Sequence, residues 1–251
     1  PGVVHMRHTH LPDHKFVKGQ PETGAELADD LERIATNFGA ENIAACIVEP
    51  ISGSTGTLVP PKGYLQRLRK ICDKHDILLI FDEVITGWGR TGSSFAAKEY
   101  GVTPDLMTMA KATTNGIVPM GVVAVKEEIY DTIVNASPDG VIELFHGYTY
   151  SGIPVAVAAA LAVQDIFEKE DIFNRAKNLS AYFLDGLFSL KDIDCIENIR
   201  GYGMMGGIDI KKTDRPGKAG FQAYKHCYEV GVNFKATGDC LIIAPPFICE
   251  K

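Results

Sequence analysis

Two ionisable residues, Asp82 and Lys111, each follow a run of mostly apolar residues. Asp82 comes after Ile-Leu-Leu-Ile-Phe at positions 77–81, and Lys111 comes after Leu-Met-Thr-Met-Ala at positions 106–110. A strand buried on both faces of a parallel sheet reads as a continuous apolar run, and ligands bind where such strands end. We therefore expect the two side chains to converge on one small molecule, with the acid holding a cationic heterocycle and the lysine holding a carbonyl carbon.

Either residue alone leaves its role open. An aspartate at a strand end can also cap the next helix or pair with an arginine, so Asp82 has a structural interpretation beside the functional one. Lys111 ends an apolar strand and is not typical of a solvated surface charge, and partial desolvation would free its amine for Schiff-base chemistry. Together, a carboxylate for a pyridinium nitrogen and a lysine for an aldehyde indicate pyridoxal phosphate.

A glycine-rich segment, residues 87–92, matches the GxGxxG pattern of dinucleotide-binding loops. The carboxylates of Asp82 and Glu83 would repel a pyrophosphate placed there. Trp88 is bulky for a turn that must admit phosphate, and no amphipathic helix pattern follows Gly92. We therefore interpret this segment as a conformationally demanding active-site loop.

Three other segments carry weaker signals. Residues 146–152, His-Gly-Tyr-Thr-Tyr-Ser-Gly, precede a helix expected from Pro154, and they suit either a phosphate or an ordinary capped loop. His8 and His10 form an HxH pair without a nearby cysteine or carboxylate cluster, so we expect no metal. Residues 200–207 are expected to form a turn that leads into a strand.

The composition is that of an ordinary globular protein of 251 residues, 45% hydrophobic and 23% charged. A net charge of −7 without a Lys/Arg-rich stretch argues against a nucleic-acid partner. We expect no signal peptide and, because no apolar run is long enough for a membrane span, no membrane partner. The six cysteines show no CxxC or metal spacing, which is typical of a reduced, cytoplasmic protein.

Strands and helices alternate in the first part of the chain. Helical periodicity from Gly24 is followed by a strand at 43–48, a helix at 64–75 and strands at 77–84, 106–110 and 121–125. This order predicts an α/β fold with a mainly parallel sheet and helices on both faces.

The pattern of helices and strands expected from the sequence changes towards the end of the chain. Long helices are expected from Pro154 and over residues 172–190. Beyond them, short strands at 204–210 and 241–244 surround a helix at 219–230. We therefore divide the chain into most of a large cofactor-binding domain, residues 1–190, and part of a smaller α+β domain, residues 191–251.

Taken together, these segments resemble the class III aminotransferases, pyridoxal 5'-phosphate enzymes of fold type I. The resemblance covers essentially the whole chain, in the order of the family. It is carried by residues 48–51 (Val-Glu-Pro-Ile), 60–65 (Pro-Pro-Lys-Gly-Tyr-Leu), 81–92, 109–111 (Met-Ala-Lys) and 146–150. Residues 7–12 and 114–121 are most similar to the ω-amino acid:pyruvate (β-alanine:pyruvate) branch.

The resemblance implies a role for each matching residue. Lys111 matches the lysine that binds the cofactor as a Schiff base and then moves the proton. Asp82 matches the carboxylate that keeps the pyridine nitrogen protonated, and Val84 matches the residue packed under the ring. Thr149 matches a threonine that binds the cofactor phosphate of the partner subunit, which implies a homodimer or a higher homo-oligomer.

Some positions depart from the family pattern. Members that use 2-oxoglutarate carry a glutamate at the position of Ser54, so the serine favours pyruvate as acceptor. The family's carboxylate-binding arginine falls at Lys235, which makes this lysine a candidate substrate ligand with a point charge in place of a bidentate fork. The family's N-terminal region, with its glycine/serine phosphate loop, is missing before Pro1, so the chain looks like a fragment that also lacks the extreme C-terminus.

The expected activity is a ping-pong transamination that moves an amino group from an ω-amino acid or amine, such as β-alanine, to pyruvate. Two alternatives stay open. A class III enzyme could use diamines, 4-aminobutyrate or aryl amines as donors, and the chain by itself could be a non-catalytic fragment with an incomplete cofactor site.

Overall fold

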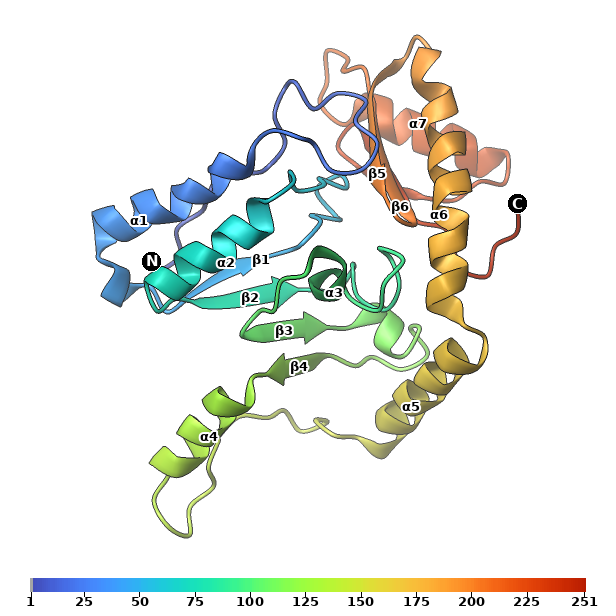
Figure 1. Ribbon diagram of the computed structural model, residues 1–251. Helices are drawn as coiled ribbons and strands as arrows, with labels where there is room; N and C mark the ends of the chain where they lie inside the picture. Colours follow the sequence, from blue (N-terminus) through green and yellow to red (C-terminus); the bar gives the residue numbers. More distant parts are fainter. Residues whose placement is uncertain (1) are drawn as a thin grey trace.

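The computed structural model describes residues 2–251, which form two four-stranded sheets connected by long helices (Figure 1). The first sheet has the order β1-β2-β3-β4, with β1 (Ala45–Val48), β2 (Leu78–Asp82), β3 (Leu106–Met109) and β4 (Val122–Val125). β1, β2 and β3 run parallel, whereas β4 pairs antiparallel with β3. The mainly parallel α/β sheet expected from the sequence is confirmed.

One face of this sheet is covered by helices. They are η1 (Ala25–Asp29), α1 (Asp30–Phe38), α2 (Tyr64–Lys74) and α3 (Ala96–Tyr100), with η2 (Ala40–Asn42) after α1. Apolar residues recur at helical spacing along α1 and α2. Their buried side chains, among them Leu31 and Leu68, join Leu79 and Phe81 of β2 in the main hydrophobic core.

The opposite face of the first sheet is largely open. Successive side chains of a strand point to opposite faces, so Ile47, Asp82 and Val123 lie on the side away from Leu79 and Phe81. Ile47 and Val123 are 62% and 61% exposed. Of the two helical layers expected from the sequence, the described residues provide the one over the core, and Asp82 ends β2 on the open face.

Asp105, just before β3, holds the other end of the strands together. Its buried carboxylate accepts hydrogen bonds from the Leu79 N–H at 2.6 Å and from Arg69 at 2.7 Å, and it pairs with Lys126 at 2.7 Å. Burial opposes ionisation, but the hydrogen bonds from Lys126, Leu79 and Arg69 outweigh it and lower the pKa of Asp105. One carboxylate therefore ties together α2, β2 and the end of β4.

The second sheet is antiparallel throughout, with the order β5-β6-β8-β7. Its strands are β5 (Ile196–Tyr202), β6 (Met205–Ile210), β7 (Lys235–Thr237) and β8 (Cys240–Ile243). The remaining helices are α4 (Glu127–Ala136), α5 (Pro154–Lys169), α6 (Ile172–Phe188), η4 (Ser189–Asp192) and α7 (Lys218–Glu229). Leu187 of α6 packs with Ile199, Ile208 and Leu241 of the sheet in a second core.

Several elements differ from the sequence-based expectation. Residues 200–202 belong to β5, so the turn expected at 200–207 is wrong in its first part, and the chain reverses only at Gly203 and Met204. At Gly203, where φ is +58°, a Cβ atom would lie 2.3 Å from the Arg90 carbonyl oxygen, so this tight approach requires glycine. The helices α3 and α4 and the strands β5 and β7 were not expected.

α5 begins at Pro154 as expected, because proline suits the first turn of a helix. No helix among the described residues combines the length and the apolar character needed to cross a membrane.

We expect Asp105→Asn to lower the free energy of unfolding at pH 7 by about 2–4 kcal/mol, because Arg69 and Lys126 lose their shared anion. The pKa of Asp105 is depressed in the folded state. Its ionised carboxylate therefore contributes fully to the free energy of unfolding above the unfolded-state pKa of about 3.9, and this contribution is lost as the pH falls below that pKa. Urea denaturation at pH 7 and pH 3 measures this, with the exposed Asp139→Asn as control. If the free energies of unfolding of wild type and Asp105→Asn differed equally at both pH values, the assignment would be contradicted.

Candidate functional site

The parallel pairing of β2 and β3 brings Asp82 and Lys111 to the same edge of the first sheet. Asp82 lies opposite Thr108 in the register, and the pairing continues one residue further, where the Glu83 N–H donates to the Thr108 carbonyl over 2.9 Å. β3 ends at Met109, and Lys111 opens the short 3-10 helix η3 (Lys111–Thr113). The structure therefore places the two residues at neighbouring strand ends, as the sequence predicted.

Asp82 keeps most of its acceptor capacity. It is half-buried, and its Oδ1 accepts only the Val84 N–H, at 3.1 Å, among the described residues. It neither pairs with an arginine of residues 2–251 nor caps α3, so both structural alternatives for Asp82 are wrong. Beside it, the hydroxyl of Thr108 is buried without a hydrogen-bond partner in the described chain. An acid with free lone pairs next to an orphaned hydroxyl fits the polar edge of the pyridine ring of pyridoxal phosphate.

Lys111 has an unusual backbone. Its φ is +44°, a left-handed conformation that costs a side-chain-bearing residue about 1–3 kcal/mol and recurs at functional sites. The side chain is exposed, so the partial desolvation expected from the sequence is not observed in this chain. The Nζ atom is thus accessible to a small-molecule carbonyl.

Glu83, the residue after Asp82, organises the loop that follows β2. Its fully buried carboxylate accepts hydrogen bonds from the Thr86 hydroxyl at 2.7 Å and from the N–H groups of Ala96 and Ala97 at 2.8 and 2.7 Å. Burial raises the pKa of Glu83, while these three hydrogen bonds oppose the increase. Glu83 caps α3, a role that sequence reasoning missed because the capping acid stands thirteen positions before Ala96.

The glycine-rich loop at residues 87–92 shows no phosphate cradle. The N–H groups of Gly87, Trp88 and Gly92 already donate to the backbone carbonyls of Glu83, Ser94 and Gly89. Trp88 has a φ of +61°, as expected for a conformationally demanding loop. The guanidinium of Arg90 donates to the carbonyls of Met204 and Pro245 at 2.9 and 2.7 Å, and its burial lowers the pKa of Arg90 to about 10. The loop therefore connects the first sheet to the second.

Three further residues were predicted for the site. Val84 is half-buried directly after β2, where it can contact a ring held by Asp82. Lys235 begins β7, and its Nζ lies 3.2 Å from the Ser54 hydroxyl, so the two positions that depart from the family pattern meet in space. Thr149 lies in an exposed segment before α5, and the structure does not bring it into contact with Asp82 or Lys111.

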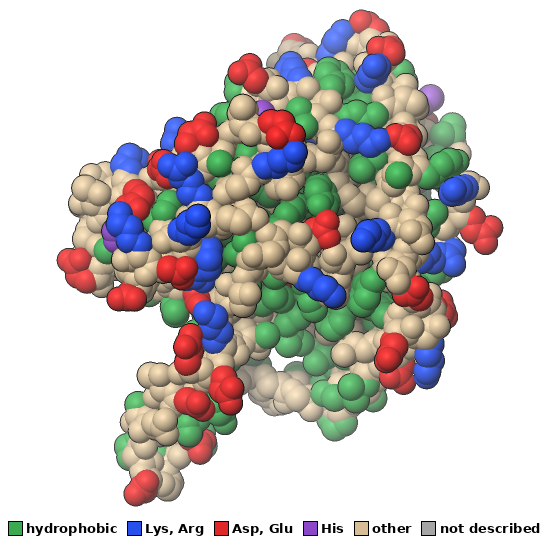
Figure 2. Space-filling model, in the orientation of Figure 1, with side chains coloured by type: hydrophobic (Ala, Val, Ile, Leu, Met, Phe, Trp, Pro, Cys, Tyr) green, Lys and Arg blue, Asp and Glu red, His purple; other side chains and the backbone are tan. Residues whose placement is uncertain are grey.

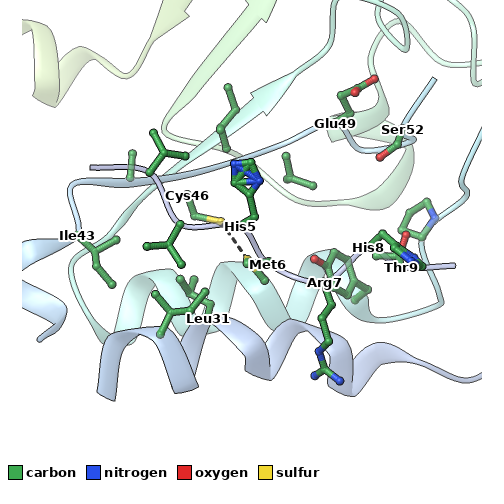
Figure 3. A pocket seen from close by; sticks show the side chains of 18 of the residues that line it. His5, Met6, Arg7, His8, Thr9, Leu31, Ile43, Cys46, Glu49 and Ser52 are labelled. Carbon is green, nitrogen blue, oxygen red and sulfur yellow. Dashed lines mark hydrogen bonds between the residues drawn. The ribbon is translucent and has the colours of Figure 1, made fainter. Parts of the chain in front are cut away.

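A groove with a volume of about 1020 Å³ lies elsewhere, between the N-terminal segment and the edge of β1 (Figure 3). In it the thiol of Cys46 contacts the sulfur of Met6 at 3.7 Å. Neither Asp82 nor Lys111 lines this groove. Within residues 2–251, no group of three or more His, Cys, Asp or Glu side chains could hold a metal, and all six cysteines are free.

The family model described as aminotransferase class-III matches residues 1–251. The chain belongs to the class III aminotransferase family. It is 52% identical to an omega-aminotransferase of Caulobacter vibrioides over 252 residues, and 47% identical to a beta-alanine--pyruvate aminotransferase of Pseudomonas aeruginosa over 248 residues. These alignments cover 100% and 98% of this chain, but 57% and 55% of the two relatives. This class III chain thus spans little more than half the length of those relatives.

Solved structures agree with this assignment. An omega transaminase from Pseudomonas jessenii in complex with PMP superposes with a TM-score of 0.84 at 31% identity, covering 93% of this chain and 53% of that chain. The fold of the class III aminotransferase chain is therefore the fold type I architecture of a transaminase.

Proposed function

We propose that the protein is a pyridoxal phosphate-dependent aminotransferase that moves an amino group from an ω-amino acid or amine, such as β-alanine, to pyruvate. The observation that carries the proposal is the position of Asp82 and Lys111 at the ends of neighbouring parallel strands in a class III chain. The orphaned hydroxyl of Thr108 beside Asp82 supports a polar ring at this place. The names of the relatives from Caulobacter and Pseudomonas favour this donor and acceptor.

Each residue has a defined task in this proposal. When bound, pyridoxal phosphate supplies an aldehyde for amines and a ring that accepts electrons. The carboxylate of Asp82 holds a proton at the ring nitrogen, and Val84 orients the ring. Nζ of Lys111 would hold the aldehyde carbon, and once freed by the incoming amine it would carry a proton away from the Cα of the amino donor. Lysine suits both tasks because the neutral amine is nucleophile and base.

The substrate carboxylate would meet Lys235. Its ammonium lies beside Ser54, and no acid among residues 2–251 pairs with it, so it can attract the carboxylate of pyruvate. A lysine binds this carboxylate as a point charge, because it lacks the planar fork of arginine.

The active form would be a homodimer or a higher homo-oligomer. Hydrophobic side chains gather at the surface near α5 (Figure 2). Large apolar residues of this region are exposed, namely Val141, Ile142, Leu144, Phe145, Tyr148, Tyr150, Val155 and Leu161. An exposed apolar surface of this kind is typical of a protein interface. A second copy covering it would receive Thr149 at its own cofactor phosphate.

We expect Lys111→Ala to lower kcat at least about 10³-fold in the protein purified at its full natural length, because the proton carrier is lost. Borohydride reduction followed by peptide mass spectrometry should attach cofactor to Lys111 in the wild type and to no residue in the variant. The exposed Lys191→Ala serves as control. Cofactor trapped on another residue of Lys111→Ala would disprove the assignment, and failure of the 251-residue chain alone to bind cofactor would favour the non-catalytic fragment.

We expect Lys235→Arg to lower the KM for pyruvate roughly fivefold, by about 1 kcal/mol, because the guanidinium adds a charge-assisted hydrogen bond. The KM for an aldehyde acceptor without a carboxylate should stay constant, and Lys191→Arg should change neither value.

The substrate class is tested by comparing rates with different substrates: β-alanine, 4-aminobutyrate and a diamine as donors, and pyruvate and 2-oxoglutarate as acceptors. A preference for 2-oxoglutarate would contradict the proposal.

We expect subunits carrying Lys111→Ala to complement subunits carrying Thr149→Ala. In a mixed dimer, the site with an intact Lys111 would receive an intact Thr149 from its partner, so wild-type cofactor affinity returns in one site of two. The measurement is a cofactor titration after the two variants are mixed and allowed to exchange. If the mixture binds cofactor no more tightly than the average of its two components, Thr149 serves the cofactor site of its own subunit or no site.

A further inference from the structure

The turn that carries Lys111 is held by a hydrogen-bonded hydroxyl. Within η3, the N–H of Thr113 donates to the Ala110 carbonyl at 3.0 Å, and the N–H of Thr114 donates to the Lys111 carbonyl at 3.3 Å. The hydroxyl of Thr113 donates to the same Ala110 carbonyl at 3.0 Å. Because Thr113 is only 3% exposed, water does not compete for these groups. The left-handed backbone of Lys111 is therefore maintained by contacts just after it.

A tryptophan from the loop after β2 completes this arrangement. The indole Nε1–H of Trp88 donates to the Thr113 hydroxyl at 3.0 Å. The hydroxyl thus accepts one hydrogen bond and donates another, which fixes its direction. A continuous path runs from Trp88 through Thr113 to the Ala110 carbonyl, which is in the peptide bond preceding Lys111.

Trp88 is itself fixed by its surroundings. Its ring packs edge-on against Phe95 at 5.1 Å between centroids and tilted against Phe167 of α5 at 6.2 Å. Ala112, the residue after Lys111, lies in the same hydrophobic cluster, together with Val163. The N–H of Trp88 also donates to a carbonyl within the loop. A large ring with few free torsions can therefore place its single donor with little loss of entropy.

The two ends of the proposed cofactor site thus meet through this contact. The loop that begins after Asp82 supplies Trp88, and the turn that begins with Lys111 supplies Thr113. Neither residue touches the Asp82 carboxylate or the Lys111 amine in the hydrogen bonds of the described chain. The path by which Trp88 reaches Lys111 in the described chain is therefore its effect on the position of the Lys111 backbone.

We infer that Trp88 is a positioning residue for Lys111, and that its indole N–H, acting through the Thr113 hydroxyl, fixes where the Lys111 amine stands relative to Asp82. This inference rests on the proposed function, because it assigns a role to Lys111. Loss of the N–H would widen the range of Lys111 conformations, so the amine would reach the aldehyde carbon and the donor Cα less often. Binding of the amino donor itself would change little.

The test compares variants that remove the hydrogen bond from either side in the protein at its full natural length. Trp88→Phe keeps an aromatic ring but has no donor, and Thr113→Val keeps the shape but has no hydroxyl. Thr113→Ser retains the hydroxyl and is the conservative rescue. Val163→Ala removes packing from the same cluster without touching the hydrogen bond, and it controls for a purely structural role.

Two measurements report on the Lys111 amine. One is the rate at which pyridoxal phosphate added to the cofactor-free protein becomes borohydride-trappable on Lys111, and the other is kcat with its KM for the amino donor. We expect Trp88→Phe to slow trapping and kcat about fivefold, as the loss of one hydrogen bond allows, with KM changed less than about twofold. Thr113→Val should slow them at least as much, because it also removes the hydrogen bond from the Thr113 hydroxyl to the Ala110 carbonyl. The double variant should be no slower than Thr113→Val alone, because Thr113→Val already removes the hydrogen bond that Trp88→Phe removes. Thr113→Ser should stay within about twofold of wild type.

The outcomes separate this inference from the proposed function. Trapping rates equal to wild type in both single variants, or effects that multiply in the double variant, would overturn the role of Trp88. A slowing in Val163→Ala as large as in Trp88→Phe would also overturn it, by showing that packing alone is responsible. If Trp88→Phe does not fold, Thr113→Val against Thr113→Ser decides the same question. Cofactor trapped on a residue other than Lys111 in the wild type would instead disprove the proposed function.

Discussion

The parallel hydrogen bonding between β2 and β3 is the constraint on which the candidate site depends. Phe81 faces Met107 and Asp82 faces Thr108 in this register. Because strand side chains alternate, a slip of one residue would turn Asp82 towards the core and a large apolar side chain towards the open face. No side-chain interaction joins Asp82 directly to Lys111 in the described chain, so backbone pairing brings the acid and the amine to the same edge of the sheet.

Two buried carboxylates secure this pairing at opposite ends. Asp105 binds the Leu79 N–H where the strands begin, and Glu83 binds the start of α3 beyond the point where they end. Burying a charge is costly unless donors surround it, and each acid has three donors among its neighbours. The pKa values of the two acids shift in opposite directions. Hydrogen bonds, two of them from cationic partners, lower the pKa of Asp105, whereas burial raises the pKa of Glu83.

The sequence was sufficient for the parts of the fold that have long apolar runs. β2, β3, α2 and α5 were predicted because burial imposes a visible pattern on them, and strand ends in a parallel sheet pointed to Asp82 and Lys111. Short elements such as α3 and β7 were not predicted, because five or three residues are too few to show a period. Contacts between distant segments were not predicted either. The pairs Lys235–Ser54 and Trp88–Thr113 depend on how loops fold back, and neither residue of a pair carries a local sign of its partner.

The open face of the first sheet has a consequence for the life of the polypeptide in a cell. β1 is an edge strand of the sheet, and its residue Ile47 is 62% exposed on the open face. Exposed apolar side chains on the face of a sheet promote association with other molecules. In a nascent polypeptide such a face would expose apolar side chains to other chains, so covering it before chains meet would favour a soluble product.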